Sequence, residues 1–420
     1  MLTGTYRYPR ADGIIFGIPW QEAMRTEVDR IGARRIFAVV SSSLLAAAAL
    51  ETSLRRALGE LFAGLADGIR AHSPREDVAR VAVAARDAKA DLLVAIGGGS
   101  VVDAAKVAQL CLARGVFSAE GFDALRTKRH EQAATPALPV RVMAVPTTLS
   151  GAEFTALAGV TDTARNVKEG YAHRDLAPRA VILDPRVTVH TPAALWLSTG
   201  IRAVDHAVED LCSINSQPLA DAASLHALRL LARSLRRTKA DASDLDARLD
   251  SMIGAWLSLV GTQGGVQKGA SHAIGHVLGG TAGVPHGFTS CVMLPHVLRW
   301  NKTVNADRQK LVSEALGEPD ADAADVVARL VTDLGLPRTL RDVKVPREKL
   351  RTIAEKAMHD PWTATNPRKI GGSDGPTAVR PPLPSSYHLD TCDPESQPPR
   401  TVCREPRGHR NYSVMCHSAN

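Results

Sequence analysis

The chain has 420 residues, which suffices for two or three domains that each bury a core of their own without disulfide bonds. Hydrophobic residues at 45% and charged residues at 23% are ordinary globular usage and exclude a disordered or fibrous protein. The net charge of +7 is not gathered into a long basic run, so we expect no nucleic-acid partner, whereas an anionic small-molecule substrate is compatible with it.

The first part of the chain alternates short apolar runs with helical patterns, which is typical of β-α-β units around a mostly parallel sheet. Ser73 and Pro74 are predicted to begin a helix as its N-cap and its first-turn proline. Buried strands are predicted at residues 34–40, 91–96, 140–145 and 179–183. We therefore expect an α/β domain over residues 1–185.

After Pro185 the apolar residues recur with the period of an α-helix. Two such stripes lie in residues 225–235 and 249–260, and a third pattern over residues 325–336 ends in Gly-Leu-Pro, a helix stop signal. These patterns predict an all-helical domain over residues 186–371.

The composition changes again near Gly371. Residues 372–420 hold eight prolines and three of the six cysteines and show no apolar period, so we predict a disordered tail. The tail is either a natural extension or a replacement for a C-terminal helix that the preceding sequence was leading into, and we favour the replacement.

The six cysteines form no C-x-x-C pair, which argues against zinc-ribbon and thioredoxin-type motifs and favours a reducing cytosol. The first 13 residues show no basic segment followed by an apolar one, and serines 41–43 interrupt the most apolar stretch. We therefore expect a cytoplasmic protein with no signal peptide and no membrane partner.

Two turns rich in glycines or hydroxyls follow predicted strands. The first joins a strand to a helix, so that backbone N–H groups and a helix N-terminus meet at the end of the strand, as pyrophosphate binding requires. Such a turn can also be purely structural, since it lacks the G-x-G-x-x-G pattern. Because a second turn ends the next strand in the same way, we predict a dinucleotide site. Its candidate residues are Gly97, Gly98, Gly99, Ser100, Thr147, Thr148 and Ser150.

One short segment is rich in histidines. His272 and His276 stand at positions i and i+4, so they share one face of a helix, and His286 follows ten residues later. His206, on an earlier helix, could face the same cleft. A lone histidine on a helix is usually structural, but the gathering of several of the 14 histidines beside glycines indicates a site.

These residues resemble the iron-containing alcohol dehydrogenase family over about residues 10–370. The resemblance implies an N-terminal dinucleotide-binding α/β domain, a C-terminal all-helical catalytic domain and, we expect, a homodimer. The matching motifs, in the family's order and spacing, are GGGSVVDAAK, PTTLSGAE, STGIRAVDHAVE, GASHAIGHVLGG, VPHG, LPHVLRWN and TNPR.

In metal-dependent members of that family, an Asp, a His four residues later and two further histidines hold the cation. His276 matches a histidine near the substrate, but Arg202 stands at the Asp position. Because a guanidinium repels a cation, we predict that Arg202 strongly weakens the binding of any divalent metal. We also expect Asp205 to be turned about 100° around the helix from its neighbour, so that it cannot replace the missing carboxylate. The three histidine ligand positions are filled by His206, His272 and His286.

The absence of that carboxylate is similar to the maleylacetate reductases, the branch of the family that lacks the full metal set. The runs AGVTDTARNVKEGY and LAPRAVILDP are similar to that branch as well. The resemblance implies NAD(P)H-dependent reduction of the conjugated double bond of maleylacetate, an anionic dicarboxylic acid, to 3-oxoadipate in aromatic-compound catabolism. Our hypothesis is that Arg202 binds a carboxylate or the enolate, while His276 or His272 donates the proton.

The same matching implies the cofactor contacts. In relatives that prefer NAD, an acidic residue after the first strand binds the ribose, and here that position is Ser41. Because no carboxylate repels a 2′-phosphate there, we expect NADH to bind and NADPH to be tolerated. Lys168 is assigned to the nicotinamide ribose, and Asp103 of the glycine motif joins the cofactor-binding set.

Two alternatives stay open at this point. One is a metal-dependent iron or zinc alcohol dehydrogenase that acts on small alcohols or aldehydes through the three histidines. The other is a non-catalytic or incompletely folded product, in which the unusual tail leaves the helical domain incomplete.

Overall fold

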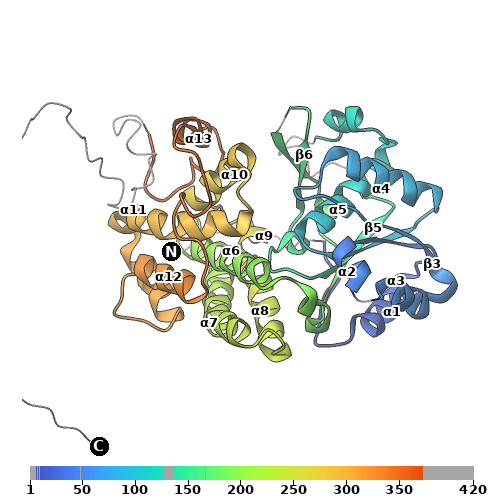
Figure 1. The fold of residues 1–420 in the computed structure, drawn as a ribbon, viewed down its shortest axis with the longest axis horizontal. Coiled ribbons are helices and arrows are strands. Elements are labelled where there is room, and N and C mark those ends of the chain that lie inside the picture. Colours follow the sequence, from blue (N-terminus) through green and yellow to red (C-terminus); the bar gives the residue numbers. More distant parts are fainter. Residues whose placement is uncertain are drawn as a thin grey trace, which may run out of the picture. The chain divides into compact units, whose positions relative to one another are not determined.

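A parallel sheet of six strands forms the centre of the first half of the chain in the computed structural model (Figure 1). The structure describes residues 6, 8, 10–47, 49–126, 136–165 and 167–371. The strands lie in the order β1-β8-β5-β4-β2-β3, and a separate antiparallel hairpin pairs β6 with β7. Their bounds are β1 Gly13–Phe16, β2 Ile36–Val40, β3 Phe62–Ala66, β4 Leu92–Gly97, β5 Arg141–Pro146, β6 Leu157–Asp162, β7 Val167–Ala172 and β8 Ala180–Leu183.

Helices cover both faces of this sheet. Phe37 and Val39 of β2 belong to the core that contains α4 and α5, whereas Ala38 and Val40 belong to the core that contains α1 and α3. This alternation is the pleat of a strand buried on both sides, which explains why the strands read as continuous apolar runs. The helices are α1 Trp20–Ile31, α2 Ser42–Ala47, α3 Leu50–Leu58, α4 Arg75–Asp87 and α5 Gly99–Arg114.

The sheet has a switch point between the neighbouring strands β2 and β4. The connection from β2 leads to β3 on one side, whereas the connection from β4 leads to β5 on the other side. In sheets of this kind ligands bind beyond the carboxyl ends of the strands at such a switch point. Ser41 directly follows β2 and Gly98 directly follows β4, so two predicted cofactor turns lie at this position.

The second half of the chain is helical and is built around α6 (Figure 1). Every residue of α6 from Trp196 to Leu211 is buried, because α7, α8 and α11 pack around it. Its charged side chains must therefore find partners inside the protein. The helices are α6 Ala193–Leu211, α7 Pro218–Ala240, α8 Leu245–Leu257, α9 Val260–Gln263, α10 Ala270–Ala282, α11 His286–Ala315 with a kink at Asn305, α12 Ala323–Asp333 and α13 Lys349–Ala357.

The fold class predicted from the sequence is confirmed, and four predicted strands match β2, β4, β5 and β8 within two residues. The predicted N-cap is wrong: Pro74 is the N-cap of α4, and Ser73 has a left-handed backbone with φ +52°. The hydroxyl of Ser73 donates instead to the carbonyl of Ser100, 2.8 Å away. The apolar stripe over residues 249–260 is not one helix, since α8 ends at Leu257 and α9 begins at Val260.

The predicted tail at residues 372–420 lies outside the described residues. The described residues all belong to one compact unit, and the division near residue 185 stays a prediction. Among these residues, no helix combines the length and the apolar character that crossing a membrane requires.

Candidate active site

The two predicted cofactor turns touch each other. A Cβ atom placed on Gly98 would lie 3.0 Å from Cγ2 of Thr148, and one placed on Gly99 would lie 2.7 Å from Oγ of Ser150. Gly98 is also the N-cap of α5, whose first backbone N–H groups have no partner within the helix. The turns therefore form a narrow cradle, in which positions 98 and 99 have no room for a side chain. The helix N-terminus in this cradle suits an anion such as pyrophosphate.

Two other predicted cofactor residues have structural partners. Oγ of Ser100 accepts the N–H of His72 at 3.0 Å, which leaves the hydroxyl proton free for another acceptor. Oδ2 of Asp103 accepts the N–H of Gly159 in β6 at 3.1 Å, so this carboxylate holds the hairpin against α5. Burial raises the pKa of Asp103, against the opposing charges of Lys106 and Lys168.

Ser41, the residue predicted at the adenosine end of the cofactor, lies half-buried at the end of β2. Its hydroxyl is 2.9 Å from that of Ser43, and its N–H donates to the carbonyl of Ile96. The bond to Ile96 joins the ends of β2 and β4, which keeps this edge of the cradle in place.

Arg202 is a buried cation in the middle of α6. Its exposed fraction is 8%, its Nη1 donates to Oγ of Ser290 at 3.1 Å and it lies 3.5 Å from Oδ2 of Asp205. Burial lowers the pKa of Arg202, and the carboxylates of Asp205 and Glu209 oppose this effect. Because a guanidinium has such a high intrinsic pKa, it stays charged here.

The expectation that Asp205 points away from the site is wrong. Its Oδ2 accepts hydrogen bonds from the hydroxyls of Ser271 and Ser290, at 2.8 and 2.6 Å, and lies 3.7 Å from Nδ1 of His272. Arg202 and Asp205 are three positions apart on α6, so they share one helix face. Three steps of about 100° along the helix bring Asp205 almost back to the direction of Arg202, so its side chain stays in the site.

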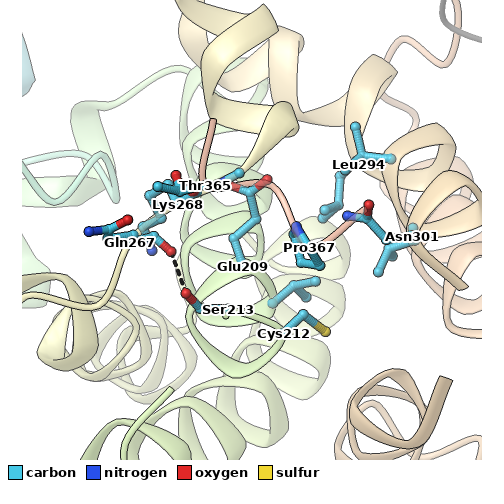
Figure 2. Close-up of a pocket in the computed structure, with 13 residues that line it drawn as sticks. Glu209, Cys212, Ser213, Gln267, Lys268, Leu294, Asn301, Thr365 and Pro367 are labelled. Carbon is cyan, nitrogen blue, oxygen red and sulfur yellow. Dashed lines mark hydrogen bonds between the residues drawn. The ribbon is translucent and has the colours of Figure 1, made fainter. Parts of the chain in front are cut away.

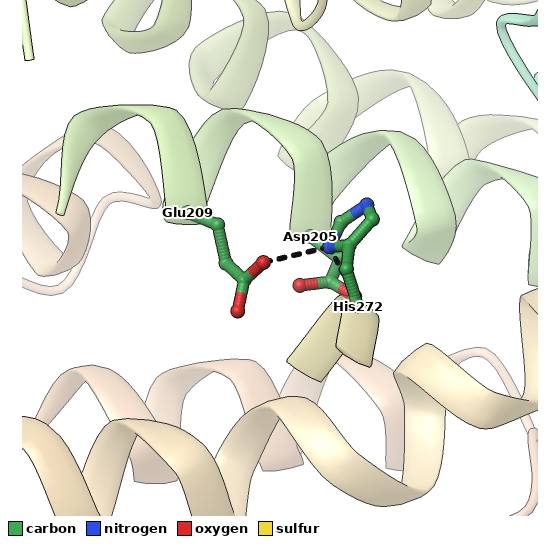
Figure 3. A group of neighbouring side chains, drawn as sticks. All are labelled: Asp205, Glu209 and His272. Atoms are coloured by element: carbon green, nitrogen blue, oxygen red, sulfur yellow. Dashed lines mark hydrogen bonds and ion pairs between the residues drawn. The ribbon is translucent and has the colours of Figure 1, made fainter. Parts of the chain in front are cut away.

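Glu209 orients His272. Oε2 of Glu209 lies 2.7 Å from Nδ1 of the imidazole, and the two carboxylate oxygens also accept the N–H groups of Gly269 and Ser271 (Figure 3). Burial raises the pKa of Glu209 to about 8, and in its ionised form Glu209 accepts the ring proton of Nδ1. Nε2 of His272 is buried and has no hydrogen-bond partner among the described residues.

The five histidines of the site form a row of rings together with Trp362. His276 lies between Trp362 and His286, and its Nδ1 is 2.9 Å from Oδ2 of Asp360. With 41% of its side chain exposed, His276 is open to solvent, unlike the buried His272. The centroid distances along the row are His206–His272 4.9 Å, His272–Trp362 5.6 Å, Trp362–His276 5.0 Å, His276–His286 6.2 Å and His286–His72 5.6 Å.

Lys168 connects the hairpin with this row. Its Nζ lies 3.0 Å from Nε2 of His286, and its aliphatic stem crosses Gly159, where a Cβ atom would overlap Cε of the lysine. Burial, followed by the charges of Lys168 and Arg202, lowers the pKa of His286 well below its usual range. The imidazole of His286 is therefore neutral beside the cation of Lys168.

The residues do not fit the family's divalent metal. Buried ligand atoms of Asp205, Glu209 and His272 lie within 4.8 Å of one another, a spacing that could hold an ion (Figure 3). However, Nδ1 of His272 and both oxygens of Glu209 are already engaged in hydrogen bonds, and Arg202 stands beside Asp205. Three buried imidazole nitrogens of the site that have no partner among the described residues would also face the charge of Arg202. They are Nδ1 of His206, Nε2 of His272 and Nδ1 of His286.

A hollow near α6 does not coincide with the row of rings (Figure 2). Glu209 and Lys268 line it together with Thr365 and Asn301, but none of the site histidines does. The hydroxyl of Ser213 donates across its edge to the carbonyl of Gln267 at 2.7 Å. Glu209 therefore lies between this hollow and the imidazole of His272.

Several residues of the site were not predicted from the sequence. Lys268 is buried and donates to Oδ1 of Asp210 and to the carbonyl of His206, each at 2.7 Å. Glu209 follows His206 by three positions in the same motif, and this spacing is the signal that could have identified it. His72 and Asp360 have no such signal, because the chain reaches the site from distant segments there.

Known proteins resemble this chain over most of its length. A family model described as iron-containing alcohol dehydrogenase matches residues 12–185, and one for the C-terminal part of the Fe-containing alcohol dehydrogenase family matches residues 196–374. The dehydrogenase ALT3 of Alternaria alternata is 37% identical over 371 residues, which cover 80% of this chain and 95% of that protein.

Two further relatives carry another name. A maleylacetate reductase of Pseudomonas knackmussii is 31% identical over 369 residues, which cover 87% of this chain and 93% of that protein. The crystal structure of a maleylacetate reductase from Agrobacterium tumefaciens has a TM-score of 0.75 at 25% identity, over 90% of this chain and 97% of that one.

Proposed function

Because the chain belongs to the iron-containing alcohol dehydrogenase family, as its motifs predicted, we propose that it is a reductase of an anionic 4-oxo-2-enedioate, with maleylacetate as the substrate and 3-oxoadipate as the product. The observation that carries this proposal is Arg202, a buried guanidinium where the family's metal carboxylate would stand. A guanidinium offers planar donors to a carboxylate or an enolate, which a simple alcohol substrate does not require. The 31% identity to a maleylacetate reductase agrees with this choice.

The cradle of Gly98 and Gly99 is the proposed binding site for the pyrophosphate of NADH, with NADPH tolerated. Support comes from the close approach of the two turns and from the N-terminus of α5. Ser41 would lie at the adenosine ribose without repelling a 2′-phosphate, and Lys168 would lie at the nicotinamide ribose. A bound NAD(P)H would supply the hydride.

The reduction requires charge stabilisation and one proton. When a hydride reaches the carbon β to the ketone, the electrons of the double bond move to the ketone oxygen and an enolate forms. Arg202 stabilises this oxyanion in a site from which water is largely excluded. The α carbon then takes one proton, so that the double bond gains two hydrogens in total.

His276 is the proposed proton donor. Its half-exposed ring can regain a proton from solvent, and Asp360 fixes its orientation through Nδ1. His272 suits this role less well, because its ring proton is held between Nδ1 and Glu209 and burial lowers its pKa well below the usual range. We assign His272 and His206 to the walls of the substrate site.

The reaction proceeds without a divalent metal in this proposal, because Arg202 carries the positive charge that a metal would supply. We expect the purified protein to contain much less than one equivalent of iron or zinc and to keep its activity after dialysis against a chelator. Metal analysis combined with an activity assay measures both. One equivalent of tightly held metal, with activity lost on its removal, would contradict the proposal.

A second candidate is a dehydrogenase that acts on an alcohol or aldehyde. It is favoured by the 30% identity to a long-chain-alcohol dehydrogenase of Geobacillus thermodenitrificans, over 79% of this chain and 85% of that protein. A screen of maleylacetate, simple aldehydes and simple ketones separates the two candidates. The oxidation of NADH or NADPH is followed by the loss of absorbance of the reduced nicotinamide. Faster turnover of a simple aldehyde than of maleylacetate would favour the second candidate.

We also propose that the enzyme acts in the cytoplasm, as a homodimer and in the catabolism of aromatic compounds.

A further inference from the structure

His72 lies at the edge of the site, and the proposed reaction gives its side chain no role. It comes from the connection between β3 and α4, far in sequence from the other histidines, and its ring lies edge-on to His286 with centroids 5.6 Å apart and an interplanar angle of 87°. The ring is half-buried, and no described residue forms a hydrogen bond with either of its nitrogens. A polar ring that is reachable from the site and has no partner in the protein is available to a ligand.

The backbone that carries this ring is strained. His72 and Ser73 are consecutive residues with left-handed φ angles of +64° and +52°. Such angles cost free energy in residues with a Cβ atom, although histidine tolerates them better than most residues. Strain of this kind persists where the surrounding structure enforces it, and it clusters at functional sites.

Four hydrogen bonds enforce this turn. Ser100 takes part in two of them: its Oγ accepts the N–H of His72 at 3.0 Å, and its carbonyl accepts the hydroxyl of Ser73 at 2.8 Å. Thr161 of β6 takes part in the other two, with its hydroxyl at 2.9 Å from the carbonyl of His72 and its N–H at 3.1 Å from the carbonyl of Ser73. The turn is therefore tied to the phosphate cradle on one side and to the hairpin that carries Lys168 on the other.

The surroundings of the ring are cationic. Burial, followed by the charge of Lys168, lowers the pKa of His72, so the imidazole is neutral and retains one N–H donor. Lys168 itself lies 3.0 Å from Nε2 of His286, between the hairpin and the helical half of the chain. An N–H donor beside a lysine is a suitable place for a carboxylate oxygen.

We propose that His72 is a substrate-contacting residue, whose imidazole donates a hydrogen bond to a carboxylate of the dicarboxylic substrate. This inference rests on the proposed function and adds to it a residue for substrate recognition from the α/β part of the chain. It would provide the substrate with a second donor, besides Arg202 on α6, from the other half of the chain. Because His72 is hydrogen-bonded to Ser100 of the cradle, the same donor could instead bind a phosphate of the cofactor. The KM values for maleylacetate and for NADH distinguish these two anions.

The test compares H72G and H72N with the wild type. Glycine removes the ring and also the left-handed strain, so H72G should melt at the same temperature as the wild type or higher. We expect its KM for maleylacetate to rise about tenfold or more, the loss of one hydrogen bond to a charged group, with an unchanged KM for NADH. Asparagine tolerates the left-handed backbone and keeps an N–H donor, so H72N should show a smaller rise.

T161V provides an independent variant, because it removes only the hydroxyl that holds the carbonyl of His72. It should raise the KM for maleylacetate while every site side chain remains present. H226N, an exposed histidine on α7, is the matched control and should change nothing.

Each outcome bears on the inference separately from the proposed function. If the wild type reduces maleylacetate and H72G does so with the same KM, the inference about His72 is overturned while the proposed function stands. A raised KM for NADH alone would assign His72 to the cofactor phosphate and also overturn it. If the wild type reduces another anionic carbonyl compound instead, the proposed function fails, and the same comparison of KM values with that compound decides the role of His72.

Discussion

The two halves of the chain contribute to the site by different means. The α/β half provides room: Gly98 and Gly99 let the two cofactor turns come within contact distance of each other. The helical half provides charge, since Arg202, Asp205 and Glu209 are buried together, beside His206 and His272. Substitutions should therefore act through bulk on the cofactor side and through charge on the substrate side.

The largest expected effect is at Arg202, on the charged side. R202D should lower kcat for maleylacetate about 100-fold, as expected when a group that stabilises an oxyanion is removed, and should increase the amount of bound metal. R202K keeps the positive charge but loses the planar donors, so we expect its activity to lie between the two. Steady-state kinetics, metal analysis and melting curves with and without zinc measure these effects. Full activity in R202D would contradict the role of the guanidinium.

A buried carboxylate in the α/β half should produce the next largest effect, on stability. Glu153 is 3% exposed, and burial raises its pKa to about 7, against the opposing charge of Lys106. The folded state holds the proton of Glu153 more tightly than the unfolded state does. Its contribution to the free energy of unfolding is therefore fully present below about pH 4.5 and is lost as the pH rises through about 7.

E153Q removes this pH dependence. The free energy of unfolding of E153Q minus that of the wild type should be larger at pH 8 than at pH 5, by on the order of 2 kcal/mol. Urea unfolding at the two pH values measures the difference, and E60Q, at an exposed position of the same half, is the control. An equal difference at both pH values would show that Glu153 does not take up the proton.

Bulk in the phosphate cradle should have a smaller effect. G98V pushes a side chain against Thr148, so it should raise the apparent constant for NADH at least tenfold, about 1.4 kcal/mol, with a smaller loss of fold stability. G13V, where a Cβ atom would meet nothing within 4 Å, is the control. A matching loss of fold stability in G98V would mean that this glycine serves only the turn.

The smallest expected effect concerns the path of Lys168. A Cβ atom on Gly159 would overlap the flexible end of this lysine, so G159A should shift Nζ away from His286 and lower activity a few-fold without destabilising the fold. G170A is a closely matched control, because Gly170 pairs with Gly159 in the hairpin and has nothing within 4 Å of its Cβ position. Equal activity in the two variants would show that the position of Lys168 is not critical.

The sequence by itself determined the features that depend on short stretches of chain. Buried strands read as apolar runs because both faces of the sheet are covered, and the cradle was predictable because its glycines directly follow β4. His272 and His276 were placed on one helix face by their spacing alone. Arg202 was identified from its motif, since a change of charge at one position is visible in the sequence.

Only the tertiary structure decided which groups these residues contact. Asp205 belongs to the site because Ser271 and Ser290 reach it from α10 and α11, and the strained turn at His72 exists because Ser100 and Thr161 hold it. Each of these partners lies far away along the chain. The hydrogen-bonding needs of a buried polar group are fixed by its chemistry, but the donor that meets them is chosen by the packing of distant segments, which no local pattern records.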